Sequence, residues 1–146
     1  MDNTPDIEYV MYVGTTPEKL WEALTHSDTT RQYWGGRRIE SDWQVGSPVN
    51  NVNPNGNSDW SGEVLQSDRS RLLSYTFNPP AFGHSSKVTF ELQHMGETVR
   101  LTMTHAGVGA DNPARSMTIE GWRAILSSLK TLLETGKPLI YSFWKG

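Results

Sequence analysis

The sequence contains no cysteine among its 146 residues. Thiol nucleophiles, cysteine zinc sites, iron–sulfur clusters and disulfide scaffolds all need sulfur, so each of them is excluded. At this length we expect a single domain over residues 1–146, which buries roughly two-thirds of the surface that the unfolded chain exposes. A core of that size needs neither disulfides nor a structural metal.

Dense positive charge and long apolar runs are also missing. Thirteen Lys and Arg residues stand against sixteen Asp and Glu, and the densest basic run is the pair Arg37-Arg38. Nucleic-acid binding depends on clustered cations, so no nucleic-acid partner is expected. The longest apolar run, Tyr9 to Val13, is far shorter than the roughly 18 residues of a membrane span. The acidic first residues do not resemble a secretory signal either, so a cytoplasmic protein without a membrane partner is predicted.

Motifs for metal binding and catalysis are absent as well. The four histidines, at positions 26, 84, 94 and 105, do not have the spacing of metal ligands. There is no Gly-x-Ser-x-Gly elbow and no glycine loop of the kind that binds phosphates. We therefore predict no metal and no cofactor, and we assign no catalytic residue.

What the sequence does contain is a clear order of elements. Alternating apolar residues predict a first strand over residues 7–13. Thr16 before Pro17 is typical of a helix start, and it predicts a short helix to about Thr25. A second short helix is expected to end near Trp34.

Residues 37–105 have a period of two, interrupted by turn residues, which predicts antiparallel strands. The most regular hairpin joins residues 88–92 to residues 99–103. Continuing its alternation places Met103 and His105 on the face of the sheet that forms the core.

The longest periodic segment runs from about Ala114 to Thr135. Trp122 begins a stripe of Ile and Leu on one side of a predicted helix that is about 30 Å long. Gly136 is typical of a helix end. The apolar tail over residues 139–146 is expected to pack on this chain or on a partner.

This order predicts an α+β fold with two short helices after the first strand. A curved antiparallel sheet of about six to seven strands surrounds the C-terminal helix, because only that helix is long and apolar enough to cover the sheet. A bent sheet and a straight helix fill space unevenly, so a cavity between them is expected.

Five segments occur in a characteristic order: 16–25, 30–35, 62–65, 72–77 and the Gly121-Trp122 pair with the leucines that follow it. This ordered set resembles the SRPBCC or START-like superfamily over nearly the whole chain. Within it, the most similar branch is that of activators of a heat-shock chaperone's ATPase (the AHSA-like branch). The Asn-rich segment 50–57 and the tail after Leu139 lie outside the family pattern.

The resemblance implies a helix-grip fold whose cavity many relatives use for lipids, polyketides, hormones or other apolar molecules. It favours a small apolar or aromatic ligand held between the C-terminal helix and the concave sheet, without a cofactor. Two alternatives stay open because fold alone does not fix function. One is stimulation of a heat-shock chaperone's ATPase, and the other is a cofactor-independent cyclase or dehydratase that uses His105 or Tyr75 as acid or base. Either a monomer or a homodimer fits this pattern.

Nine inward-facing side chains are the candidate ligand contacts. They either fill the interface between helix and sheet or line a pocket whose polar groups are Tyr75, His105 and the Trp indoles. His105 has two interpretations of its own: a buried neutral imidazole satisfied by a backbone group, or a polar anchor for a ligand. The nine candidates are Trp34, Trp43, Trp60, Tyr75, Phe77, Phe90, Met103, His105 and Trp122.

Overall fold

A computed structural model describes residues 7–141, and its elements follow the predicted order. Two short helices follow the first strand, six more strands come next, and one long helix comes last. The elements are β1 (Ile7–Val13), α1 (Pro17–Thr25), α2 (Ser27–Tyr33), β2 (Arg38–Glu40), β3 (Pro48–Val52), β4 (Ser58–Asp68), β5 (Leu72–Phe77), the 3₁₀ turn η1 (Pro80–Phe82), β6 (Ser86–Met95), β7 (Thr98–Ala106) and α3 (Arg115–Thr135). The predicted α+β class is confirmed.

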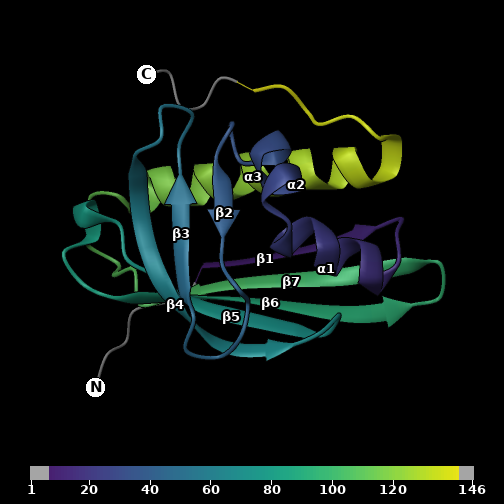
Figure 1. The fold of residues 1–146 in the computed structure, drawn as a ribbon, viewed down its shortest axis with the longest axis horizontal. Helices are drawn as coiled ribbons and strands as arrows, with labels where there is room; N and C mark the ends of the chain where they lie inside the picture. Colours follow the sequence, from purple (N-terminus) through teal and green to yellow (C-terminus); the bar gives the residue numbers. More distant parts are fainter. Residues whose placement is uncertain (1–6, 142–146) are drawn as a thin grey trace.

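The sheet has seven strands in the order β1-β7-β6-β5-β4-β3-β2, and every neighbouring pair is antiparallel. Figure 1 shows that β2 and β3 cross the direction of β1, β7 and β6, so the sheet is strongly bent. Helix α3 lies across the open side of this bend, with α1 and α2 beside it (Figure 1). The structure therefore confirms the predicted curved sheet around a C-terminal helix.

The bend is located in β4. Its first half pairs with β3 and its second half with β5, and both pairings shift register along the strand, as expected of β-bulges. Gly62 lies between the two halves, where a Cβ atom would come within 1.8 Å of the Thr76 carbonyl oxygen. Only glycine allows β5 to approach this closely, so Gly62 is required by the curvature that opens the sheet toward α3.

The core lies between α3 and the concave face of the sheet. The Trp-Ile-Leu stripe of α3 is buried as predicted, with Leu126 and Leu129 at most 1% exposed. Met103 and His105 of β7 are fully buried on the inner face, which confirms the alternation expected for that strand. No helix within residues 7–141 combines the length and apolarity needed to cross a bilayer.

The described part of the C-terminal tail packs on its own chain. The hydroxyl of buried Ser128 accepts from the Leu139 amide (3.1 Å) and donates to the Leu139 carbonyl (3.0 Å). The Tyr141 hydroxyl donates to the carbonyl of Tyr33 at the end of α2 (2.8 Å). Residues 139–141 thus run back along α3 to α2 without forming a strand, while residues 142–146 lie outside the described chain.

Candidate functional site

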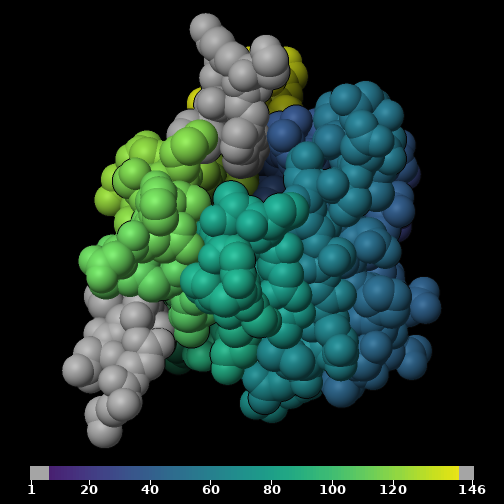
Figure 2. All heavy atoms as spheres, turned by 90° about the vertical axis from the view of Figure 1, so that its left-hand side faces the viewer, coloured from purple at the N-terminus to yellow at the C-terminus, as the bar shows by residue number. Residues whose placement is uncertain are grey.

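A cleft of about 310 Å³ lies between the N-terminal half of α3 and the open end of the bent sheet. Figure 2 looks onto this face, where the start of α3 (green), the segment around η1 (teal) and the β3–β4 connection (blue) come together. The volume is at the lower end of the range for small-molecule pockets. The cleft is lined by Trp34, Arg37, Asn51, Asp59, Trp60, Phe77, Pro79, Ala81, Phe82, Ala114, Met117, Thr118, Gly121, Trp122 and Ile125.

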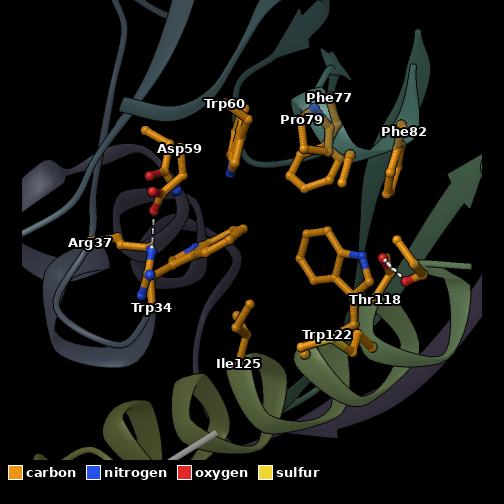
Figure 3. Close-up of a pocket in the computed structure, with 15 residues that line it drawn as sticks. Trp34, Arg37, Asp59, Trp60, Phe77, Pro79, Phe82, Thr118, Trp122 and Ile125 are labelled. Carbon is orange, nitrogen blue, oxygen red and sulfur yellow. Dashed lines mark hydrogen bonds and ion pairs between the residues drawn. The ribbon is translucent and has the colours of Figure 1, made fainter. Parts of the chain in front are cut away.

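Five aromatic rings from five different elements form the walls. They come from the end of α2 (Trp34), from β4 (Trp60), from the end of β5 (Phe77), from η1 (Phe82) and from α3 (Trp122). Trp34 meets Trp122 edge to face with ring centroids 5.4 Å apart, and Trp60 contacts Phe77 at 4.5 Å. In Figure 3 these rings border one common space. Such walls suit a flat apolar molecule, because aromatic faces bury large areas in fixed geometries.

One end of the cleft is polar. The Arg37 Nε donates to Asp59 Oδ2 at 2.6 Å, and Asn53 Nδ2 donates to Asp59 Oδ1 at 3.0 Å. The Arg37 and Asp59 side chains are 19% and 37% exposed, so both are partly shielded from water. Figure 3 shows this pair beside Trp34 and Trp60, on the opposite side of the cleft from Phe82 and Thr118.

Buried Asn51 joins this polar end to the aromatic wall. With its amide oriented to satisfy both neighbours, its nitrogen donates to Asp59 Oδ2 (3.3 Å) and its oxygen accepts from Trp60 Nε1 (2.9 Å). Asn51 is 0% exposed, so both bonds are shielded from water and hold Trp60 in place.

A glycine pair brings Arg37 to this position. Helix α2 ends at Trp34, and Gly35 and Gly36 both have a positive φ, 64° and 86°. This conformation favours glycine, and it reverses the chain so that β2 starts beside α2. Buried Thr30 fixes the reversal, because its hydroxyl accepts from the backbone amide of Ile39 at 2.9 Å.

A second polar group lies behind the aromatic wall. Trp122 Nε1 donates to His105 Nδ1 (3.0 Å), and His105 Nε2 is 2.8 Å from Ser86 Oγ. The Ser86 hydroxyl donates its single proton to the carbonyl of Phe77. The imidazole proton therefore lies on Nε2 and is donated to Ser86, so these four residues form a continuous chain of hydrogen bonds, the His105 network.

The His105 imidazole is neutral in this network. Burial, assisted by the positive charge of Arg115, lowers the pKa of His105 to about 3. Its two nitrogens are bonded to Trp122 and Ser86, and the ring does not line the cleft. His105 is thus a buried neutral imidazole, as in the first of its two interpretations, although side chains rather than a backbone group satisfy it. This geometry gives no support to His105 as an acid or base.

Of the nine predicted contacts, Trp34, Trp60, Phe77 and Trp122 line the cleft. The other five lie in the layer behind it: Trp43, Tyr75, Phe90, Met103 and His105. In that layer, the Tyr75 ring stacks on Trp60 at 5.8 Å, and burial raises the pKa of the Tyr75 hydroxyl. For all nine, contact with a ligand stays a prediction.

The polar end of the cleft escaped sequence reasoning. Asp59 precedes Trp60 in β4, so regular alternation would place the two on opposite faces of the sheet. The β3–β4 pairing shifts register here and leaves both residues opposite Asn51, so Asp59 reaches the cleft as well as Trp60. A usable signal was present in the Asn-rich segment 50–57, whose side-chain amides can donate to a carboxylate. Among residues 7–141, no three His, Asp or Glu side chains gather where they could hold a metal ion.

Comparisons with solved structures give the same fold. A protein of Mesorhizobium loti is 28% identical, with a TM-score of 0.77, and the match covers 88% of this chain and 96% of that one. The Aha1 dimer of Colwellia psychrerythraea is 23% identical with a TM-score of 0.78, covering 91% and 98%. An Hsp90 activator of Plasmodium falciparum is 20% identical with a TM-score of 0.76, covering 88% and 95%. No curated protein sequence matches this chain significantly.

The family assignment comes from the sequence model that matches residues 14–134, from the turn after β1 to the end of α3. This range contains all of the described residues that line the cleft. The chain therefore belongs to the family of Activator of Hsp90 ATPase homolog 1-like proteins, as the resemblance of its segments predicted.

Proposed function

We propose that this protein binds a small apolar or aromatic molecule in the cleft between α3 and the bent sheet, without a cofactor. The observation that carries the proposal is the cleft itself, about 310 Å³ in volume and walled by aromatic rings from five elements. A mostly apolar concavity with a few polar groups at one end is the usual form of a small-molecule site.

The surroundings of the cleft support binding rather than simple packing. The His105 network holds the indole of Trp122 and the carbonyl of Phe77, and Asn51 holds the indole of Trp60. Three walls are therefore fixed before any ligand arrives, which reduces the entropy that binding would cost.

The test is a screen of lipids and aromatic compounds by native mass spectrometry and ligand-observed NMR. A matched pair of variants then locates the site. Thr118 and Thr131 both lie on α3 and both donate to the carbonyl four residues earlier, but only Thr118 lines the cleft. Thr118→Trp should fill the cleft and abolish binding of any hit, whereas Thr131→Trp should leave it intact. Absence of any hit, or equal binding by Thr118→Trp, would overturn the proposal.

The family membership supports a second candidate, stimulation of a heat-shock chaperone's ATPase. Its test is the ATPase turnover of Hsp90 with and without this protein, and unchanged turnover contradicts it. A homodimer is the matching assembly prediction, since the Colwellia relative is a dimer. Sedimentation of the free protein distinguishes monomer from dimer.

A further inference from the structure

The Asn-rich segment 50–57 has a definite structural role. Asn53 accepts from the amides of Asn55 and Asn57 through its Oδ1, which closes the loop on itself. Its Nδ2 then donates to Asp59, and Asn51 donates to the same carboxylate. The segment thus forms a bracket that holds the Asp59 carboxylate at the polar end of the cleft.

Charge at this end is balanced. Of the described residues that line the cleft, only Arg37 and Asp59 are ionised, and they bond to each other at 2.6 Å. Asp59 receives donors from Arg37, Asn51 and Asn53, so its carboxylate is fixed by three groups. A ligand entering along the aromatic walls meets a positive and a negative charge of equal size, with no excess of either.

We infer that this end of the cleft, formed by Arg37, Asp59 and the Asn bracket, selects ligands that end in an uncharged hydrogen-bonding group such as a hydroxyl. The inference rests on the proposed function and specifies its ligand class: a flat aromatic body with a neutral polar head. A charged head loses its hydration on entry and finds no uncompensated opposite charge in return. A hydroxyl loses less hydration, and it can donate to the carboxylate and accept from the donors around it.

Three probes of nearly the same shape separate these cases: 2-naphthol, 2-naphthoate and 2-naphthylmethylammonium. The wild-type protein should bind 2-naphthol about ten-fold or more tightly than either charged probe. Affinities are measured by ligand-observed NMR at neutral pH and low salt, where the charges of the probes are fixed and screening is weak.

Two neutralising variants should change the preference in opposite directions. Asp59→Asn removes the negative charge beside Arg37, so 2-naphthoate should gain about ten-fold relative to 2-naphthol. Arg37→Gln leaves Asp59 uncompensated, so the ammonium probe should gain instead. The double variant restores the charge balance and with it the preference for 2-naphthol, which also shows that loss of folding does not explain the single variants.

The matched control is a second Arg–Asp ion pair, which lies outside the cleft. Arg38 Nη1 lies 3.2 Å from Asp28 Oδ1 at the surface and does not line the cleft. Asp28→Asn and Arg38→Gln change the net charge equally but should leave the order of the three probes unchanged.

The outcomes distinguish the two proposals. Equal binding of the three probes by wild type, or variants at positions 37 and 59 that behave like the controls, overturns the charge selection while the cleft remains a binding site. No binding of any probe, together with an empty compound screen, overturns the binding function and the selection with it.

Discussion

The aromatic cleft is flanked by two polar networks that differ in charge and in access to water. The His105 network is neutral, and its two central members, His105 and Ser86, are buried behind the cleft walls Trp122 and Phe77. The pair Arg37–Asp59 is ionised, partly exposed and borders the cleft directly. The two networks have different tasks. The polar groups of the His105 network are bonded to one another behind the walls and hold them in place, whereas polar groups at the cleft surface can contact a ligand.

The largest expected effect is on stability, and it comes from β4, the strand that carries Asp59 and runs beside the Phe77 strand β5. β4 carries Asp59 and Trp60 and passes β5 at Gly62, where a Cβ would meet the Thr76 carbonyl at 1.8 Å. Gly62→Ala should therefore reduce the free energy of unfolding by about 4 kcal/mol or more, since β4 and β5 must separate. Urea unfolding followed by circular dichroism measures the loss. The neighbouring exposed Ser61→Ala is the control and should change stability by less than about 0.5 kcal/mol; similar losses in both would contradict the close-approach argument.

The second effect is a pH dependence of the free energy of unfolding, which the His105 network should produce. The pKa of His105 is about 3 in the folded protein against 6.5 for a free histidine. Between these values the unfolded chain binds a proton that the folded chain does not, so the free energy of unfolding falls as pH falls from 6.5. The loss attributable to His105 should reach up to about 3 kcal/mol by pH 4.

Urea titrations at several pH values test this in the wild type and in His105→Gln. The variant has no imidazole to titrate, so its stability should depend much less on pH in this range. Equal slopes for the two proteins would show that His105 is not the source.

The third effect breaks the His105 network at neutral pH. His105→Leu leaves the Trp122 indole N–H without its acceptor inside the core, which should cost about 2–3 kcal/mol of unfolding free energy. His94→Leu, at an exposed position of β6, serves as the control and should be nearly neutral. An equally small effect at both positions would mean that the network contributes little to stability.

The smallest effect comes from a third cluster, at the surface. Glu134 accepts from the Gly14 amide (2.8 Å) and from Lys130 Nζ (2.7 Å), and the Lys130 bond is the larger cause of the lowered pKa of Glu134. Glu134→Gln should cost at most about 1 kcal/mol, because water screens exposed charges. The wild-type contribution is present above the unfolded pKa of 4.5 and is lost as pH falls through the lowered value.

Glu120→Gln is the matched control for Glu134. The ion pair of Glu120 is with Arg123 on the same helix, so replacing Glu120 should change the melting temperature less than replacing Glu134, which links α3 to the end of β1. A larger loss from Glu120→Gln would contradict the assignment of Glu134 as a link between α3 and β1.

The sequence predicted the fold well because periodicity is local. The alternation along β7 and the stripe that starts at Trp122 were readable residue by residue, and burial follows both. The polar end of the cleft was not readable, since Arg37 and Asp59 are 22 residues apart and meet only through the Gly35-Gly36 reversal and the bend of β4. A contact between distant residues that depends on the curvature of the sheet produces no periodic pattern in the sequence.

The two hydrogen bonds between the Ser128 hydroxyl and the Leu139 backbone offer a way to detect whether a ligand occupies the cleft. These bonds hold residues 139–141 against α3. At the end of this segment the Tyr141 hydroxyl donates to the carbonyl of Tyr33, one residue before Trp34 in the cleft wall. A ligand that displaces Trp34 should also shift the Tyr33 carbonyl and thereby strain the hydrogen bonds that hold residues 139–141. Hydrogen exchange at the Leu139 amide should therefore speed up when such a ligand enters and stay constant when the ligand fits the existing space.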